Sequence, residues 1–412
     1  MSEYSVLRLS NPLISTKPLN GKQILIIVEN LPVPFDRRVW LEAQTLSAAG
    51  AKVSIICPKT RQYPQSFELL NGISIYRHPL PEATSGAFGY FIEYLSALLW
   101  QSFFSWRIFL KHGFDVIHGC NPPDLVFLIY LQFKLFGVSF IYDHHDITPE
   151  LFEAKYEKKG ILHRAMLFFE RCSFYFSKVS IATNDSYKKI AITRGRKDPN
   201  DVFVVRSGPD LSRLKTVPSC DDWKNGRSYM VGYVGVMGEQ EGIDLLLHAV
   251  KSLVSDYGRN DCQFVLVGGG GALEEMKALS AELKIADYVT FTDRISDEAL
   301  FEVLSTADVC VNPDRVNDMN DKSTMNKIME YMAFAKPIVQ FDVTEGRVSA
   351  QDSSLYAREN DPVDLARKID SLLLDPELRA TMGQLGYVRV TEELGWDRSV
   401  DPLIAAYSKV LR

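Results

Sequence analysis

"GKQILIIVENLPVPFDRRVWLEAQTLSAAGAKVSIICPK", residues 21–59, contains one complete strand–helix–strand pattern. The run 24–28 is continuously apolar, which is typical of a parallel strand buried on both faces. After a proline-containing loop, residues 37–50 have helical periodicity and end at Gly50, a residue that favours a helix C-terminus. Residues 52–57 form the next apolar run, so the whole stretch predicts a βαβ unit.

The same alternation continues along the chain. Further runs predicted as strands, two of them entering glycine loops, lie at 114–119, 138–143, 178–183, 201–208, 229–238, 262–271, 288–293, 307–313 and 336–342. The polar stretch 210–228 interrupts the alternation and indicates a linker. The pattern predicts two Rossmann-like α/β domains, at 1–209 and 229–392, facing a central cleft. A last helix at 393–412 could return to the first domain.

Composition restricts the class of protein. The chain has 412 residues, of which 46% are hydrophobic and 24% charged, as in ordinary globular proteins. Six cysteines are scattered without a CxxC pair, which excludes a cysteine-based zinc cluster and argues against a disulfide framework. The first residues contain no apolar run of the signal-peptide type. These features predict a cytoplasmic protein.

Charge is divided unevenly between the two halves. Residues 1–215 contain 26 Lys and Arg against 19 Asp and Glu, a net charge of +7. Residues 216–412 contain 20 Lys and Arg against 33 Asp and Glu, a net charge of −13. The asymmetry fits two domains with different partners, and undirected drift between domains would give the same result.

Two predicted strands run into glycine loops. Gly235, Gly238 and Gly242 separate a strand from a helix, where a backbone can approach a phosphate and a helix N-terminus offers free N–H groups. The run 268–271 does not fit the GxGxxG spacing, because Leu273 stands where the last glycine would fall. A nicotinamide cofactor is therefore not expected. Tight turns would explain both loops equally well.

The segment "STMNKIMEYMAFAKPIV", residues 323–339, predicts a helix followed by a strand. Ser323 or Thr324 could cap this helix. Lys327 and Glu330 share one face of it, and Glu330 could accept both hydroxyls of a ribose. The plain alternative is a local ion pair on a solvated face.

A second polar cluster, "YDHHDITPE", occupies residues 142–150. The spacing is not a familiar zinc pattern, and adjacent side chains on a strand point to opposite faces, so His144 and His145 are not expected to share a metal. The structural alternative is a histidine-rich turn held by Asp143.

"KIMEYMAFAKPIV" resembles the second half of the E-x7-E region of glycosyltransferase family 4, which has the GT-B fold. The segments "ILIIVENL", "FDVIHG", "YDHHDITPE", "VVRSGPDLSRL", "YVGVMGEQEGIDLLLHAV", "FVLVGGGG" and "LSTADVCVNP" agree with the family in order, over roughly residues 22–410. The resemblance implies sugar transfer from a nucleotide-sugar with retention at the anomeric carbon. It implies an acceptor that is a saccharide or a polyprenyl-diphosphate-linked saccharide, and neither a cofactor, a metal nor a nucleic-acid partner is expected.

The resemblance also implies roles for individual residues. The expected donor-binding residues, in the C-terminal domain, are Gly235, Gly238, Gly269, Gly270, Asn326, Lys327 and Glu330. The expected catalytic residues are His118, His145 and Lys322. Residues proposed for the diphosphate or the acceptor are Asp36, Arg37 and Arg38, where an anion would also meet the helix N-terminus of the acceptor-binding domain.

Several positions depart from the family pattern. Lys322 stands where the first Glu of E-x7-E would be, and Val236 and Glu241 replace the Arg and Lys that neutralise the diphosphate. Cys120 replaces the histidine of a strand-end motif, leaving His118. Two alternatives therefore stay open: a sugar-nucleotide epimerase of the same fold, and a non-catalytic partner subunit.

Two aromatic-rich segments, 90–113 and 160–178, are next to basic residues that include the run 153–160. The longest uncharged stretch of the first, residues 94–106, is too short to span a bilayer, which takes about 20 residues. Such segments can lie in the headgroup layer, so reversible attachment to the inner face of the cell membrane is predicted. Ordinary buried helices of an α/β domain are the alternative.

Overall fold

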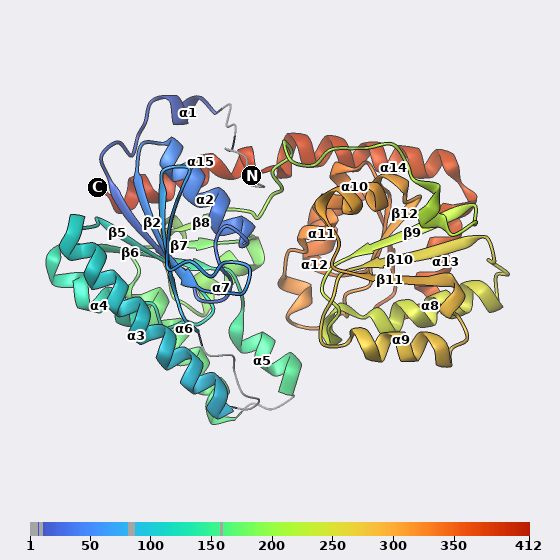
Figure 1. Ribbon diagram of the computed structural model, residues 1–412, viewed down its shortest axis with the longest axis horizontal. Helices are drawn as coiled ribbons and strands as arrows, with labels where there is room; N and C mark the ends of the chain where they lie inside the picture. The colour runs from blue at the N-terminus through green and yellow to red at the C-terminus, as the bar shows by residue number, and fades with distance from the viewer. Residues whose placement is uncertain (1–6, 8–10, 81–86, 157–159) are drawn as a thin grey trace. The chain divides into compact units, whose positions relative to one another are not determined.

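The computed structural model describes residues 7, 11–80, 87–156 and 160–412 (Figure 1). They divide into two compact units, one running to Ser207 and including Trp396–Arg412, the other comprising Gly208–Gly395. Each unit has its own parallel sheet, which confirms the predicted α/β class. Residues 157–159 of the run 153–160 lie outside the described residues.

The first unit is built on an eight-stranded sheet in the order β3-β4-β2-β1-β5-β6-β7-β8. Its strands are β1 (Gln23–Ile27), β2 (Lys52–Pro58), β3 (Phe67–Leu70), β4 (Ile73–His78), β5 (Val116–Cys120), β6 (Ser139–His144), β7 (Val179–Ala182) and β8 (Val202–Val204). Every neighbouring pair is parallel except β3 with β4. Its helices are α1 (Pro12–Ser15), α2 (Arg37–Ala48), α3 (Ala87–His112), α4 (Phe127–Phe133), α5 (Thr148–Tyr156), α6 (Ile161–Phe176), α7 (Asp185–Thr193) and α15 (Trp396–Val410).

Side chains alternate along β6 and show which helices cover which face. Ile141 belongs to the core cluster that includes residues of α2 and α15. Phe140 stacks on Tyr130 of α4, and Tyr142 packs edge-on against Phe174 of α6. Successive strand residues point to opposite faces, so α4 and α6 cover the face opposite to α2 and α15. Tyr76 of β4 contacts Phe104 of α3, which places α3 on the α4 side as well.

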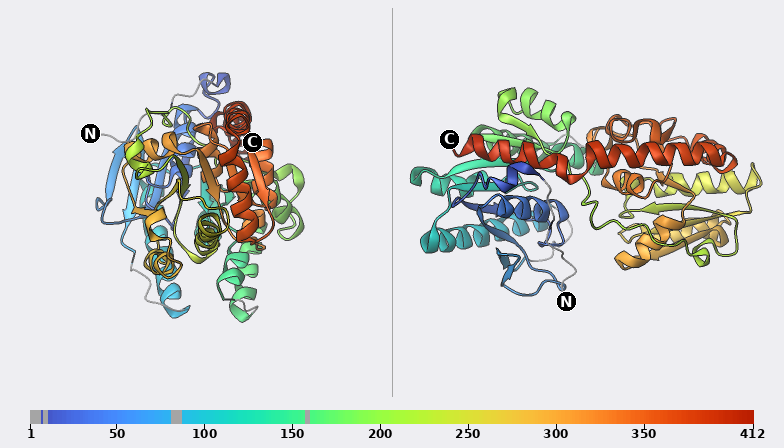
Figure 2. Two further views of the ribbon diagram at one scale, coloured as in Figure 1. Left: turned by 90° about the vertical axis from the view of Figure 1, so that its right-hand side faces the viewer. Right: turned by 90° about the horizontal axis from the view of Figure 1, so that it is seen from above.

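The second unit has a six-stranded parallel sheet in the order β11-β10-β9-β12-β13-β14. Its strands are β9 (Tyr229–Val234), β10 (Cys262–Val267), β11 (Val289–Asp293), β12 (Val309–Asn312), β13 (Ile338–Phe341) and β14 (Ser354–Ala357). Its helices are α8 (Ile243–Ser255), α9 (Leu273–Glu282), α10 (Asp297–Thr306), α11 (Asn326–Ala333), α12 (Thr344–Ala350), α13 (Pro362–Leu374) and α14 (Pro376–Arg389). The two views of Figure 2 show the sheet of each unit flanked by its own helices.

Two helix predictions need correction. The sequence of residues 123–137 predicts one helix that ends at Gly137, but α4 ends at Phe133 and continues as a 3-10 turn, η1 (Lys134–Phe136). Neither Ser323 nor Thr324 caps α11, whose N-cap is Met325 without a side-chain hydrogen bond. Among the described helices, none is both long and apolar enough to cross a membrane.

Candidate active site

Arg38 is the centre of a buried polar cluster at the carboxyl ends of β5 and β6. Asp36 caps α2 by accepting from the Val39 backbone N–H, which leaves Arg38 in the first turn, turned inward and only 9% exposed. Its guanidinium donates to Asp143 Oδ1 at 3.0 Å. It also donates to the Val205 carbonyl at 2.8 Å and to Ser207 Oγ at 3.0 Å. The charge of Arg38 is therefore satisfied inside the first unit.

The predicted catalytic residue His118 belongs to this cluster but is fully buried. Its Nδ1 lies 2.7 Å from the Tyr407 hydroxyl of α15 and its Nε2 lies 3.1 Å from Asp143 Oδ2. Burial lowers the pKa of His118, more than the nearby Asp143 raises it, so the ring is neutral at neutral pH. Both ring nitrogens of His118 are therefore engaged within the cluster. Its catalytic role stays a prediction.

His145 also depends on Asp143. Its Nε2 lies 2.5 Å from Asp143 Oδ2 and 3.0 Å from Arg38 Nε, and its backbone N–H donates to Asn121 Oδ1 at 2.6 Å. The side chain remains 14% exposed. His145 is thus held rigidly while its ring keeps access to solvent, and its catalytic role stays a prediction. The structural alternative, a turn held by Asp143, describes these contacts well.

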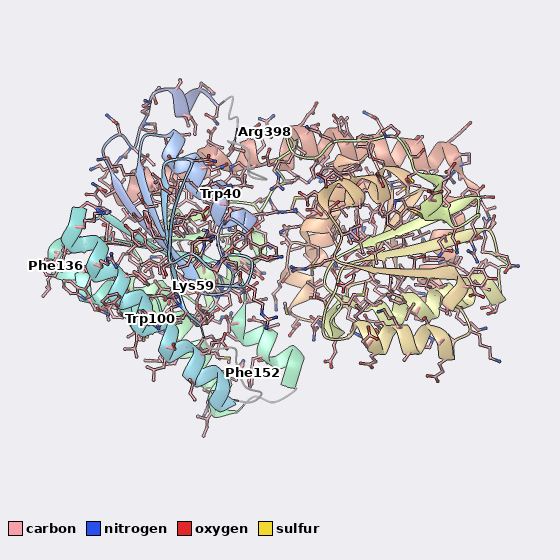
Figure 3. The ribbon with its side chains drawn as sticks, in the orientation of Figure 1. Trp40, Lys59, Trp100, Phe136, Phe152 and Arg398 are labelled. Atoms are coloured by element: carbon pink, nitrogen blue, oxygen red, sulfur yellow. The ribbon has the colours of Figure 1, made fainter. Side chains whose placement is uncertain are left out.

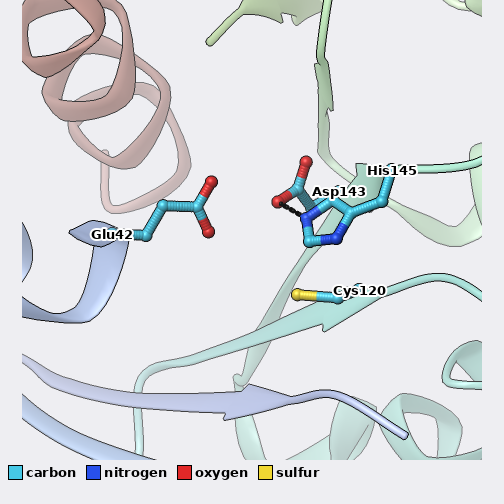
Figure 4. A group of neighbouring side chains, drawn as sticks. All are labelled: Glu42, Cys120, Asp143 and His145. Carbon is cyan, nitrogen blue, oxygen red and sulfur yellow. Dashed lines mark hydrogen bonds and ion pairs between the residues drawn. The ribbon is translucent and has the colours of Figure 1, made fainter. Parts of the chain in front are cut away.

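Four ligand-type side chains meet in this cluster: Glu42, Cys120, Asp143 and His145, whose nearest atoms lie within 4.8 Å of one another (Figure 4). Arg38 already supplies the positive charge, because its Nη2 lies 3.1 Å from Glu42 Oε1 as well as 3.0 Å from Asp143. Burial raises the pKa of the Cys120 thiol well above its ordinary value, so the sulfur is not a thiolate. A metal at this position would compete with the guanidinium of Arg38.

The pKa values of the two carboxyl groups beside Arg38 are shifted in opposite directions. Burial raises the pKa of Glu42 well above its ordinary value, and the negative charge of Asp143 adds to this effect. Burial alone would also raise the pKa of Asp143, but Arg38 and His145 hold it well below its ordinary value. Asp143 is therefore the ionised partner of Arg38, and ionisation of Glu42 is disfavoured beside it.

His144 points to the other face of the sheet, as the strand alternation predicts. Its Nε2 lies 3.4 Å from Glu170 Oε1, and its ring packs against Phe174. Arg194 makes two hydrogen bonds to Glu170, at 2.7 and 2.6 Å, and two to Glu150, at 2.7 and 3.1 Å. This network joins α5, α6 and the end of α7. His144 and His145 do not converge on one site.

In the second unit, the glycine loops after β9 and β10 pack directly on one another. Gly235 N–H donates to the Val267 carbonyl, and Met237 N–H donates to the Gly269 carbonyl, both at 3.0 Å. Gly268 has a φ of +130°, and a Cβ there would lie 1.8 Å from the Gly235 carbonyl oxygen. A Cβ on Gly270 would lie 2.3 Å from the Met237 oxygen. Glycine is therefore required for loop packing, whether or not a ligand also binds.

Lys327 of α11 extends to this pair of loops. Its Nζ donates to Asp314 Oδ1 at 2.9 Å and lies 4.8 Å from the centre of the Tyr233 ring. A Cβ built on Gly235 would lie 3.3 Å from the same Nζ. Burial alone would lower the pKa of Lys327, but Asp314 and Tyr233 raise it above its ordinary value. A permanent ammonium group therefore lies at the end of β9.

The other candidate residues of the second unit lie in the loop after β9, on α11 and in the turn before it. Glu241 is close enough to Gly238 that a Cβ there would lie 2.7 Å from Glu241 Oε2, and burial raises the Glu241 pKa. On α11, Asn326 is exposed and Glu330 is half-buried. Lys322 ends the 3-10 turn η6 (Asn320–Lys322). Their roles stay predictions, as do those proposed for Arg37, which is exposed, and for Asp36.

Sequence reasoning missed four residues that organise these sites: Glu42, Asp143 as the partner of Arg38, Tyr233 and Asp314. A usable signal existed for Asp314, which follows the predicted strand 307–313 at the edge where ligands bind. Glu42 follows Arg38 by four residues, a spacing that predicts an ion pair on one helix face. Nothing in the sequence shows that this pair is buried.

Comparison with known proteins assigns both units. A family model described as "Glycosyltransferase Family 4" matches residues 36–213, and one described as "Glycosyl transferases group 1" matches residues 228–375. The alpha-D-kanosaminyltransferase of Streptomyces kanamyceticus is 29% identical over 38% of this chain and 39% of its own. The D-inositol 3-phosphate glycosyltransferase of Geodermatophilus obscurus is 30% identical over 51% of this chain and 48% of its own. The chain spans about half the length of the curated relatives that it matches.

Solved structures show the same fold over the whole chain. The sucrose-phosphate synthase of Thermosynechococcus elongatus has a TM-score of 0.77 at 20% identity, covering 94% of this chain and 98% of that one. Anabaena Alr3699/HepE in complex with UDP has a TM-score of 0.69 at 13% identity, covering 94% and 99%. With a matched family domain in each unit, the chain belongs to the GT-B glycosyltransferases that combine a family 4 domain with a group 1 domain.

Proposed function

We propose that the protein is a retaining glycosyltransferase that moves a sugar from a nucleotide-sugar to a saccharide or to a polyprenyl-diphosphate-linked saccharide. The observation that carries the proposal is the ammonium of Lys327 beside Gly235, in the glycine loop after β9. Several solved structures of the same fold, including Alr3699/HepE, contain UDP. The donor diphosphate is assigned to this position.

The chemistry asks the protein to stabilise the charge that develops on the leaving diphosphate. Lys327 is suited to this task, because Asp314 keeps it protonated and its Nζ is already fixed at the strand end. The missing side chain at Gly235 brings the backbone of the loop close to the Lys327 ammonium, which a bound phosphate would also contact. Glu330, one turn further along α11, is assigned to the ribose hydroxyls, and Asn326 to the same nucleotide.

The acceptor is assigned to the first unit, near the carboxyl ends of β5 and β6. The His145 side chain keeps 14% of its surface exposed and can meet an acceptor hydroxyl, whereas His118 holds Asp143 in place from behind. Attack on the face that the diphosphate leaves lets the leaving phosphate take the acceptor proton. No strong protein base is then needed.

The test measures nucleotide released from a panel of nucleotide-sugars, with soluble saccharides and with lipid-linked saccharides as acceptors. The critical variant is Lys327→Met combined with Asp314→Asn, because losing the lysine alone would leave the buried carboxylate of Asp314 unpaired. We expect turnover to fall by roughly a hundredfold, the value of an electrostatic contact to a developing charge. Lys277→Met on the exposed surface of α9 is the matched control. Equal turnover in both variants would refute the assignment.

A non-catalytic subunit is favoured by one observation, the presence of Glu241 beside Lys327 where family members have a cation. Calorimetry separates the two possibilities, because a subunit without a donor site should bind no nucleoside diphosphate. A sugar-nucleotide epimerase would convert or hydrolyse the donor with no acceptor present. Acceptor-dependent release of nucleotide therefore supports the transferase over both alternatives.

A further inference from the structure

Helix α3 carries large apolar residues on both sides, unlike an ordinary surface helix. Its inward side buries Phe104 and Ile108. The same side buries Gln101 and Ser105, each with a polar atom that has no hydrogen-bond partner among the described residues. Its outward side exposes apolar residues: Leu99 is 63% exposed, Phe103 55% and Leu110 79%. A helix surrounded by water on its outer side would normally place polar residues there. Something less polar than water is expected to cover this side.

Helix α6 presents a second unusual stripe. Phe168 is 61% exposed and Tyr175 is 78% exposed, seven residues apart and therefore on one face. Arg164 and Arg171 alternate with them at helical spacing and are also exposed. The acid of this helix, Glu170, is buried against Arg194. The outward stripe of α6 thus alternates aromatic and basic side chains.

The end of α4 connects these two helices into one surface. Phe136 of η1 packs against Trp106 and Phe109 of α3, with ring centres 5.9 and 5.2 Å apart. On the other side, Lys134 Nζ lies 5.8 Å from the centre of the Phe176 ring of α6. Leu135, between them, is 95% exposed. Figure 3 labels Trp100 and Phe136, which lie on the α3 and η1 parts of this surface.

We define the apolar–basic face as the outward surface of α3, η1 and α6, represented by Leu99, Phe103, Leu110, Leu135, Phe168 and Tyr175. Its exposed charges are basic: Arg107, Lys111, Lys134, Arg164 and Arg171. The described residues of α3, α4, η1 and α6 include two acids: Glu170 is buried, and Glu93 is half-buried with its Oε2 enclosed. The face is therefore cationic as well as apolar.

We propose that the apolar–basic face docks on the surface of an anionic lipid bilayer, with α3 lying in the headgroup layer. Apolar and aromatic side chains surrounded by Arg and Lys are the pattern of interfacial helices. The absence of exposed acids among those described helices matches the negative charge of the lipid. A contact across the 26 residues of α3, about 39 Å at the rise of an α-helix, provides a broad attachment.

This inference extends the proposed function to the place where a lipid-linked acceptor would be met, but its test needs no donor. Vesicles of equal parts phosphatidylglycerol and phosphatidylcholine are compared with pure phosphatidylcholine vesicles by co-sedimentation. The full chain should sediment with the anionic vesicles and be released by high salt, which screens the basic residues. Nucleotide release with a soluble saccharide, measured without vesicles, tests the transfer reaction separately.

Variants of exposed residues test whether this face is the one used. Phe168→Ser with Tyr175→Ser, and separately Arg164→Glu with Arg171→Glu, should each weaken vesicle binding at least about tenfold. Matched controls in the second unit are Leu374→Ser with Val363→Ser, which are 67% and 55% exposed, and Lys277→Glu. The controls should bind as the parent chain does. Circular dichroism melting checks that every variant remains folded.

Three results would overturn the proposal. The first is a parent chain that stays in the supernatant with anionic vesicles at low salt. The second is vesicle binding that the α6 variants leave unchanged, or that the controls weaken equally. The third is a dimer in solution that the same α6 variants dissociate, without any vesicle binding. In that case a second copy of the chain, rather than lipid, covers the face.

Discussion

Arg38 on α2 and Asp143 at the end of β6 form a buried ion pair, with Nη2 3.0 Å from Oδ1. The arginine side chain is 8% exposed and the aspartate is fully buried. The pair connects α2 to β6. It also fixes His145, whose Nε2 lies 3.0 Å from Arg38 Nε. Its first consequence is structural, because a buried charge that loses its partner is very costly.

Replacing Arg38 and Arg37 separately should therefore give different results. Arg38→Met leaves Asp143 buried without its cation and should lower the free energy of unfolding by roughly 3–5 kcal/mol. Arg37→Met changes an exposed residue and should alter the free energy of unfolding by about 0.5 kcal/mol or less. Urea unfolding measures this free energy for both variants. A similar, small change in the two variants would show that Asp143 does not depend on Arg38.

The same pair of variants separates folding from ligand contact. If Arg37 contacts the donor diphosphate or the acceptor phosphate, Arg37→Met should reduce turnover roughly tenfold at unchanged stability, the loss of a charge-assisted hydrogen bond. Normal turnover in Arg37→Met would remove Arg37 from the site. Arg38 already uses its donors within the first unit, so any activity it loses should follow the loss of stability.

Glu29 gives a prediction about pH. It follows β1, is 3% exposed, and its Oε1 has no hydrogen-bond partner. Burial, with a contribution from Glu93, raises its pKa to about 8. Because the folded pKa is raised, the stabilising contribution of the protonated form is complete below the unfolded pKa and is lost as pH rises through about 8.

Glu29→Gln removes this titration, so the parent chain should lose stability relative to the variant between about pH 5 and pH 9. The difference should reach up to about 4 kcal/mol, from the size of the pKa shift. Urea unfolding across this range measures it, with the exposed Glu359→Gln as control. Parallel curves for the parent and Glu29→Gln would show that Glu29 is ionised in the folded protein.

Glu330→Ala tests the assignment of the ribose. Loss of charged hydrogen bonds should weaken nucleoside diphosphate binding by roughly 2–3 kcal/mol. Glu274→Ala on α9 is a suitable control, since that carboxylate is 83% exposed and its ion-pair partner among the described residues is Lys277. Calorimetry measures the affinity of both variants for the nucleoside diphosphate. Unchanged affinity in Glu330→Ala would mean that the nucleotide binds elsewhere or not at all.

Much of the fold could be predicted, because the sequence of a buried parallel strand is a continuous apolar run. The stretch 21–59 gives β1, α2 and β2 directly. The antiparallel pair of β3 with β4 was missed, although its turn contains Asn71-Gly72, both with positive φ, which is a strong hairpin signal. Strand β14 was missed because its four residues carry only a weak period.

The candidate sites were less predictable for a physical reason. Arg37 and Arg38 are the same residue type at neighbouring positions, and only the packing of α2 on the sheet turns Arg38 inward. The buried His118 contacts Tyr407, 289 residues away in the chain. Long-range contacts of this kind determine the protonation state of a side chain and its access to solvent, and a single sequence shows neither.

Gly268 and Gly271 provide the sharpest test of the loops after β9 and β10. Gly268 has a φ of +130°, and an added Cβ would lie 1.8 Å from the Gly235 carbonyl oxygen, whereas a Cβ on Gly271 would meet nothing within 4 Å. Gly268→Ala should therefore cost about 3 kcal/mol or more in stability, through backbone strain and overpacking. Gly271→Ala should change stability by about 0.5 kcal/mol or less.

The same two variants connect loop packing to donor binding. Because Gly268→Ala separates the loop that holds Gly235 from the loop after β10, it should move Gly235 away from Lys327 Nζ and weaken nucleoside diphosphate binding at least about tenfold. Gly271→Ala should bind as the parent chain does. Calorimetry and urea unfolding are run on both. If Gly268→Ala loses stability but keeps full affinity, the close contact of the loops serves folding alone, and the diphosphate does not lie against Gly235.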